Sequence, residues 1–422
     1  MRKTVKIIVA ITLVLLFIPI SGEWFKYLGY LFDGEESSVN ELNFKEFANS
    51  TAEVVGVKDK YADSLIIPSK VMIGMRVHTV TGIGDSSFYN CRNLKAIKIP
   101  TSVTSIGDSA FYGCFSLKQV EIPTSVTSIG KQAFERCSDL THIEIPTSVT
   151  SIGEYAFDGC LNLEQIEIPS SVTIIEDATF RFCRRLEHIE IPSGVTSIGD
   201  YAFLGCERLE HIEIPSNVTS IGFSAFRMCE RLEHIEIPSS VTSIGGYAFS
   251  QCLNLRNIEI PSSVSNIGMG VFERCRKLEE VTIPSNVMTI GEGLFRECVS
   301  LKSVNIPLGV RKIEKNAFYG CDDLERVEMP LSVVSIGISA FKNCKNLKYI
   351  MIPLNVGSIG KEAFENCVGL WIMEIPSRVR FVGSYAFRGC KNLNVKIHPL
   401  LLNGERIFGD DPFKDCLSVT YY

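Results

Sequence analysis

The chain has 422 residues, of which 45% are hydrophobic and 21% are charged, and its formal net charge is -6. It is too apolar to remain disordered and too long for one globular core of ordinary size. No basic stretch is dense enough to neutralise a phosphate backbone, which excludes nucleic acid as a general partner.

The N-terminal residues indicate export. Residues 1–6 are basic, residues 7–20 carry no charge, and residues 21–22 are small. This apolar core of 14 residues is shorter than the ~20 that a helix needs to cross a bilayer, which favours a signal peptide over residues 1–22. The alternative is an uncleaved anchor, with the aromatic residues of 24–30 at the membrane interface, and this is the only membrane contact expected. We therefore expect a secreted or cell-surface protein.

Residues 23–64 are expected to form an N-terminal cap or linker. Ser38 and Glu41 match a capping box, in which a hydroxyl and a carboxylate three residues later satisfy free backbone N–H groups. This pattern predicts a short helix through Leu42, Phe44 and Phe47 that would shield the first repeat. The alternative is a tether, because residues 33–38 are acidic and rich in serine.

One pattern of 23 residues organises residues 65–397. The repeat is I-P-x-x-V-T-S-I-G-x-x-A-F-x-x-C-x-x-L-x-x-I-E. Its phenylalanine recurs from Phe88 to Phe387 and its cysteine from Cys91 to Cys390, in fourteen consecutive copies. The first copy is lengthened by nine residues, and residues 398–422 form a partial copy expected to cap the array.

The letters of the repeat predict one turn of a stacked coil. Ile143 and Ile145 alternate with polar residues, which predicts a short strand, and Pro146 ends it because proline cannot donate to a strand ladder. Residues 156–160 are expected to form one helical or 3₁₀ turn that leads to Leu163. No single copy can bury its own apolar side chains, so the copies must stack ~4.8 Å apart into a solenoid.

Residues 99–121, IPTSVTSIGDSAFYGCFSLKQVE, resemble the BspA-like, or Treponema-type, leucine-rich repeats. The resemblance covers roughly residues 52–420. It implies a right-handed, curved solenoid with a parallel β-sheet on its concave side. The convex side would carry short 3₁₀ or helical turns or irregular segments. The resemblance also implies a secreted or cell-surface protein, often one that adheres to host proteins or cells.

The cysteines are expected to be buried thiols. All but one of the fifteen occupy the same repeat position, between the phenylalanine and the leucine, and Cys416 occupies the equivalent place in the partial copy. Stacked coils would bring neighbouring Cα atoms within disulfide range, which is the alternative. Metal binding is not expected, because thiolates strung along a line do not converge on one ion.

The strand residues that face away from the core form the candidate site. If Ile143 and Ile145 point inward, His142 and Glu144 point outward, because side chains alternate along a strand. Seven consecutive copies place glutamates in one file, and four of the six histidines stand in the file beside it. The candidate partner-binding residues on this concave face are Glu121, His142, Glu144, Glu167, His188, Glu190, His211, Glu213, His234, Glu236 and Glu259.

An acidic file of this kind has a chemical preference. Carboxylates one coil apart repel each other by about 1 kcal/mol per pair even in water, and adjacent histidines can offset the repulsion. We expect the file to receive a basic segment of a host or matrix protein, with a row of Ca²⁺ ions as a weaker alternative. A different explanation is gene-segment duplication, since RLEHIEIPS occurs verbatim at residues 185–193, 208–216 and 231–239. In that case the file has no ligand.

The sequence does not indicate an enzyme. It contains no GxSxG, HExxH, Walker A or complete GxGxxG motif, and the histidines lack a nucleophile beside them. No cofactor and no catalytic residue are expected. The predicted function is adhesion-like protein binding by an exported leucine-rich-repeat protein. The alternative is a structural or scaffolding component of the cell envelope with no specific concave ligand.

Overall fold

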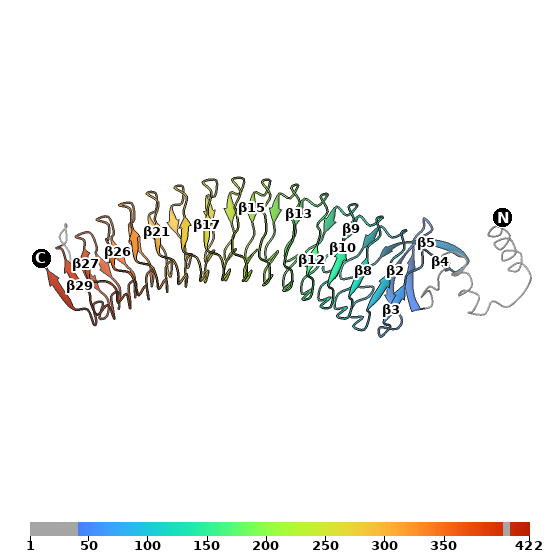
Figure 1. Cartoon of the computed structure of the whole chain (residues 1–422), viewed down its shortest axis with the longest axis horizontal. Coiled ribbons are helices and arrows are strands. Elements are labelled where there is room, and N and C mark those ends of the chain that lie inside the picture. The colour runs from blue at the N-terminus through green and yellow to red at the C-terminus, as the bar shows by residue number, and fades with distance from the viewer. Residues whose placement is uncertain (1–40, 400–405) are drawn as a thin grey trace, which may run out of the picture. The chain divides into compact units, whose positions relative to one another are not determined.

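The computed structural model describes residues 41–399 and 406–422, so the predicted signal peptide and Ser38 lie outside the described residues. The chain divides into two compact units, Met1–Ser171 and Val172–Tyr422, termed unit 1 and unit 2. Within each unit the chain winds into coils that lie side by side in chain order (Figure 1).

The described part of unit 1 starts with paired strands. β1 (Leu42–Glu46) pairs antiparallel with β2 (Thr51–Val57), and β2 pairs in parallel with β5 (Arg76–Ile83). β4 (Lys70–Ile73) pairs antiparallel with β5. The helix predicted from the capping box is therefore wrong. The backbone groups of β1 find partners along the edge of β2, which a short helix would leave open, and Leu42 is buried there.

Two parallel ladders run through unit 1, and strands in its middle coils pair with the strand 23 residues away. The Ser-Ile ladder follows the V-T-S-I part of the repeat, and the His-Glu ladder follows the x-Ile-Glu part. The Ser-Ile ladder contains β5, β7 (Ser105–Ile106), β9 (Ser128–Ile129) and β11 (Ser151–Ile152). The His-Glu ladder contains β3 (Ser64–Ile66), β6 (Ala96–Lys98), β8 (Gln119–Glu121), β10 (His142–Glu144) and β12 (Gln165–Ile166).

Unit 2 has the same two ladders, with the Ser-Ile ladder divided into two hydrogen-bonded sheets and the His-Glu ladder into three, and the predicted solenoid of parallel strands is confirmed in both units. Its Ser-Ile ladder contains β13 (Ile174–Ile175), β14 (Ser197–Ile198), β15 (Ser220–Ile221), β16 (Ser243–Ile244), β18 (Asn266–Ile267), β20 (Thr289–Ile290), β22 (Lys312–Ile313), β24 (Ser335–Ile336), β26 (Ser358–Ile359), β28 (Phe381–Val382) and β30 (Ile407–Phe408). Its His-Glu ladder contains β17 (Asn257–Glu259), β19 (Glu280–Thr282), β21 (Ser303–Asn305), β23 (Arg326–Glu328), β25 (Tyr349–Ile350), β27 (Ile372–Ile375), β29 (Asn394–Ile397) and β31 (Ser418–Tyr421).

Equivalent side chains from successive coils stack to form the core. The rings of Phe203 and Phe226 are parallel within 6°, with centroids 5.3 Å apart, and both are fully buried. Phe111 and Phe134 repeat this contact in unit 1, at 5.1 Å. Such a pair contributes roughly 0.5–1.5 kcal/mol beyond the burial of its surface. Each coil therefore depends on its neighbours for a large part of its stability.

The repeated cysteines are free and packed, as the sequence predicts. The Cys252 thiol donates a hydrogen bond to the Phe226 carbonyl oxygen of the preceding coil, with Sγ 3.2 Å from that oxygen. The same carbonyl accepts the Cys229 backbone N–H at 3.2 Å. Burial raises the pKa of the Cys252 thiol to about 12, so the thiol keeps the proton that it donates. Cysteine is thus both a small core side chain and a donor to a buried carbonyl.

The segment between each Ser-Ile strand and the buried cysteine is a run of turns. Tyr201 has φ 59° and Gly205 has φ 75°, values that a right-handed α- or 3₁₀ helix does not contain. The N–H groups of Tyr201 and Phe203 donate to the carbonyls of Phe223 and Ala225 in the next coil, both at 2.8 Å. The predicted helical or 3₁₀ turn is therefore wrong. Hydrogen bonds between coils satisfy backbone groups that a helix would satisfy within itself.

Candidate binding face

In unit 1 the His-Glu ladder carries the predicted residues on its outer surface. The central residue of β8 and of β10 is buried, and the residues on either side are exposed. His142 and Glu144 therefore point outward, and the register sets Glu144 directly beside Glu121. Glu167, which follows the last residue of β12, is also exposed. The structure thus brings these acidic side chains together on adjacent coils.

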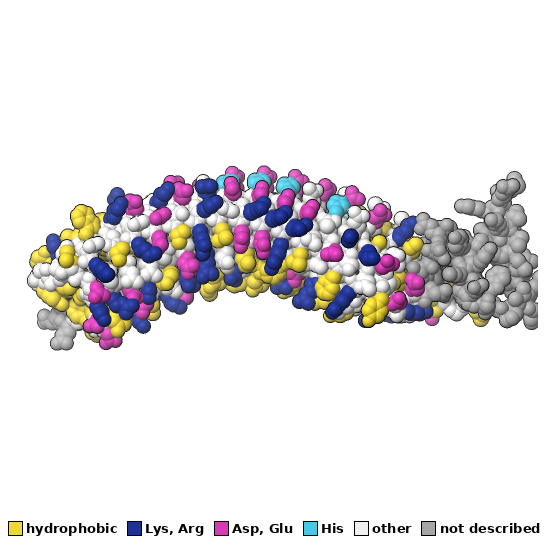
Figure 2. Space-filling model, turned by 60° about the horizontal axis from the view of Figure 1, so that its bottom comes forward, with side chains coloured by type: hydrophobic (Ala, Val, Ile, Leu, Met, Phe, Trp, Pro, Cys, Tyr) yellow, Lys and Arg dark blue, Asp and Glu magenta, His cyan; other side chains and the backbone are white. Residues whose placement is uncertain are grey.

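In unit 2, three of the predicted histidines and four of the glutamates occupy the same repeat positions, in the coils that lead up to and include β17. A parallel β-bridge joins His188 to His211, so the two imidazoles leave the same face one coil apart. His211 Nε2 lies 3.9 Å from Glu213 Oε1, and His234 Nε2 lies 3.7 Å from Glu236 Oε1. In Figure 2 the histidines of unit 2 stand beside one another along a row of acidic side chains. The exposed residues are His188, Glu190, His211, Glu213, His234, Glu236 and Glu259.

The four glutamates of this row, Glu190, Glu213, Glu236 and Glu259, are termed the glutamate file. The side chains of Glu213 and Glu236 are 91% and 90% exposed. Among the residues that the structure describes, neither carboxylate pairs with lysine or arginine, and histidine is the neighbour of each. Within residues 41–399 and 406–422, the face therefore presents two carboxylates that have histidine, and no lysine or arginine, as their ion-pair neighbour.

In the next row along the coil, Glu187 and Glu210 are paired with arginine. Arg208 Nη1 lies 3.1 Å from Glu187 Oε1, and the following coil repeats this ion pair at the same distance. A polar hollow of about 640 Å³ lies beside the histidines. Its lining residues are Glu210, His211, Arg231, Glu233, His234, Asn254 and Lys277. Charge of both signs lines this hollow, in contrast to the glutamate file.

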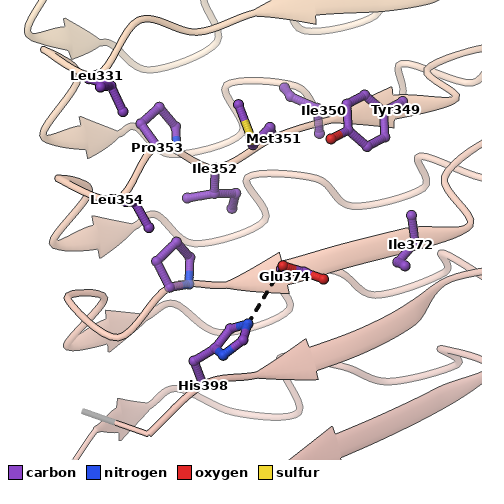
Figure 3. Close-up of a pocket in the computed structure, with 11 residues that line it drawn as sticks. Leu331, Tyr349, Ile350, Met351, Ile352, Pro353, Leu354, Ile372, Glu374 and His398 are labelled. Atoms are coloured by element: carbon purple, nitrogen blue, oxygen red, sulfur yellow. Dashed lines mark ion pairs between the residues drawn. The ribbon is translucent and has the colours of Figure 1, made fainter. Parts of the chain in front are cut away.

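An apolar hollow, which the sequence analysis missed, lies further along the ladder of unit 2 (Figure 3). Its cavity is about 460 Å³ and includes one ion pair, with Glu374 Oε2 3.6 Å from His398 Nε2. The large apolar side chains that line it are Leu331, Tyr349, Met351, Leu354 and Ile372. A surface of this composition can bind apolar side chains of a partner.

The sequence feature that could have predicted this hollow is a leucine repeated in three consecutive coils, two of which, Leu331 and Leu354, line it. Leu308, Leu331 and Leu354 each follow the proline of the repeat, where the ten preceding copies have threonine or serine. They are 86%, 61% and 67% exposed. The three coils differ at most of their other surface positions, unlike the coils that share RLEHIEIPS. Recent duplication therefore does not account for the shared leucine.

No cluster of three or more His, Cys, Asp or Glu in residues 41–399 and 406–422 is arranged to hold a metal ion. Nor does that described part contain a helix both long and apolar enough to cross a membrane. The chemistry that the face offers is therefore that of its exposed carboxylates, imidazoles and apolar side chains.

Stacked coils of parallel strands, each with a buried leucine before its His-Glu strand, define a leucine-rich-repeat solenoid. The family model described as a BspA type leucine rich repeat region (6 copies) matches residues 77–187, 150–279, 196–325, 265–394 and 311–421. The chain belongs to this BspA-type leucine-rich repeat family, which is linked to protein interaction at surfaces. The predicted resemblance is confirmed.

Solved structures of two bacterial leucine-rich-repeat proteins are similar to this chain. A leucine-rich repeat protein from Bacteroides ovatus ATCC 8483 is 33% identical, with a TM-score of 0.79, over 87% of this chain and 97% of that chain. A leucine rich cell surface protein from Faecalibacterium prausnitzii A2-165 is 35% identical, with a TM-score of 0.57, over 73% of this chain and 92% of that chain. No curated protein matches this chain. The matched family indicates no enzyme, and leucine-rich-repeat proteins generally mediate contacts between proteins.

Proposed function

We propose that this protein is exported and binds another protein, in an adhesion-like role, through the glutamate file and the histidines beside it. The observation that carries this proposal is the contrast between two adjacent rows of unit 2. Glu187 pairs with Arg208, whereas Glu213 and Glu236 point into solvent with only histidine nearby. In unit 1, His142, Glu144 and Glu167 offer a second strip of exposed imidazole and carboxylate groups, with Glu121 beside Lys98 at one end.

The proposed partner presents a basic segment. Carboxylates on adjacent coils are about one strand spacing, ~4.8 Å, apart, where two unit charges repel by about 1 kcal/mol even in water. A row of lysines or arginines would replace this repulsion with attraction and would speed association at low salt. Calcium fits less well, because each coil supplies one carboxylate and a calcium site needs six to eight oxygen ligands.

Substitution of the glutamate file tests this proposal. The variant Glu190→Gln, Glu213→Gln, Glu236→Gln removes three charges from the unpaired row. The matched control, Glu187→Gln, Glu210→Gln, Glu279→Gln, removes three charges from carboxylates of the neighbouring row that pair with arginine or lysine. The probes are a labelled oligolysine peptide, measured by anisotropy at low salt, and secreted or host-surface proteins in a pull-down.

We expect the first variant to bind the peptide at least about tenfold more weakly and to lose its salt-sensitive protein partner. The control variant should keep its affinity for the peptide and its salt-sensitive protein partner. Equal binding by the wild type and both variants would contradict an acidic binding site. That outcome would favour the scaffolding role, in which this face is only solvated.

Export rests on the composition of residues 1–22 and on the similar F. prausnitzii protein, which is described as a cell surface protein. N-terminal sequencing of the protein recovered from the culture medium or cell surface tests it. A mature N-terminus close to residue 23 supports cleavage, and Met1 retained in the membrane fraction supports the anchor. Full-length protein confined to the cytosol would contradict export.

A further inference from the structure

We propose that the partner is a single extended segment with a basic run that lies on the glutamate file and a large apolar side chain that enters the apolar hollow. This inference rests on the proposed function and adds a second anchor to it. The two surfaces together define the chemistry of the partner more narrowly than the charge alone.

The glutamate file and the apolar hollow lie in the same unit and in the same part of the repeat. Glu259 ends β17, and Met351 follows β25 four coils later, with β19, β21 and β23 in between. Backbone hydrogen bonds link these coils in sequence, from Glu279 N–H to the Arg256 carbonyl and onward to Lys348. At ~4.8 Å per coil the separation is about 19 Å, which about six residues of extended chain would span.

The residues between the two surfaces carry little unpaired charge. The positions that continue the glutamate file are Thr282 and Asn305, which are neutral, and Glu328, which pairs with Arg326. Negative charge on this face therefore ends at the exposed Glu280, one coil beyond Glu259, and the apolar surface begins several coils later. A matching ligand has a basic run, a neutral spacer and then an apolar anchor.

The apolar hollow supplies a contact that the charged file cannot. Leu331, Met351 and Leu354 expose most of their side-chain surface to water around a cavity of about 460 Å³. A cavity of this size accommodates a leucine or phenylalanine side chain, and contiguous exposed apolar surface of this kind is typical of interaction sites. The ion pair of Glu374 and His398 closes one end of the hollow with polar groups (Figure 3).

Synthetic peptides test the two anchors separately with the full chain. One peptide joins an oligolysine run to a Leu-Phe pair through a Gly/Ser spacer of about six residues, and it is made in both chain orders. The comparison peptide carries the same run and spacer without Leu-Phe. We expect one joined order to bind at least about tenfold more tightly than the comparison peptide, because a large apolar side chain leaves water.

The hollow variant is Leu331→Ser with Leu354→Ser, which restores the residue type that most coils carry at this position and should therefore fold. This variant should bind the joined peptide no more tightly than the comparison peptide, and its affinity for the oligolysine run should be unchanged. Ile338→Ser, which alters an exposed apolar residue that does not line the hollow, is the control and should keep the gain.

The outcomes separate this inference from the proposed function. If the wild type does not bind oligolysine at low salt, the acidic site itself fails. If oligolysine binds and Leu-Phe adds nothing in either order, the hollow is not an anchor and the proposed function stands. A gain that survives in the Leu331→Ser, Leu354→Ser variant also overturns the inference, because it places the apolar contact elsewhere.

Discussion

The glycine that follows each Ser-Ile strand shows how stacking selects a single residue. A Cβ atom on Gly222 would lie 2.4 Å from the carbonyl carbon of Gly199 in the preceding coil. Neither glycine is among the residues with positive φ. Glu176 and Glu314 occupy this position in two coils, and neither has a positive φ. Close approach of the backbones, and not backbone conformation, therefore excludes a side chain at Gly222.

Gly291 holds the same repeat position, but a Cβ atom there would meet nothing within 4 Å. We expect Gly222→Ala to lower the free energy of unfolding by about 1–3 kcal/mol, because the added methyl group must push two coils apart. Gly291→Ala should be neutral or stabilise by up to about 1 kcal/mol, because alanine restricts the unfolded chain. Urea unfolding of the two variants measures the difference. Equal costs would show that the position needs glycine for another reason.

At the scale of strands and turns, a local sequence pattern predicted the structure correctly where the contact that stabilises the structure recurs in every copy of the repeat. The alternation of Ile143 and Ile145 with polar residues placed a strand correctly, since each coil pairs with a copy of itself. The expected helix at residues 42–47 failed, because the capping box is local whereas the pairing of β1 with β2 depends on residues further along the chain. The expected helical turn failed for the same reason, since its N–H groups donate to the next coil.

One part of the candidate site could likewise be predicted from a local sequence pattern, and another part could not. Alternation along the strand predicted the outward direction of His142 and Glu144, and their exposure follows from it. The apolar hollow draws its walls from two parts of the repeat, Leu331 and Leu354 after the prolines and Met351 in the strand row. The order of these residues in the sequence does not show that they lie around one cavity. Their register in the stacked coils was needed to bring them together.

At the scale of the whole molecule, the repeat places a buried thiol in successive coils, so the effect of one thiol on the pH dependence of stability is multiplied. Burial raises the pKa of Cys91 to about 11 and that of Cys252 to about 12. An unfolded thiol has a pKa of about 8.5. Above that pH the unfolded chain releases protons that the folded chain retains. The stability contributed by each thiol is therefore fully present below about pH 8.5 and is lost as pH rises from there toward the folded pKa.

Alkali should therefore unfold this protein in reductant without any chemical damage. Each deeply buried thiol removes about 1.4 kcal/mol of stability per pH unit above its unfolded pKa, so a few coupled coils lose a large share of a typical ~5–15 kcal/mol. The variant Cys206→Ala, Cys229→Ala, Cys252→Ala removes three adjacent thiols whose pKa burial raises. It should be less stable than the wild type at pH 7.5, because each alanine leaves a cavity and removes a hydrogen bond to a phenylalanine carbonyl.

From pH 8.5 to pH 10, however, the stability of this variant should fall by about 4 kcal/mol less per pH unit than that of the wild type. Urea unfolding followed by circular dichroism at several pH values gives both slopes. Tyrosine and lysine titrate in the same range in both proteins, so the difference between the slopes isolates the thiols. If the stability of both proteins fell equally with pH, ionisation of the thiols in the unfolded chain would not be the cause of the loss of stability in alkali. Because each coil contacts only its neighbours, unfolding that begins in one group of coils should spread along the stack.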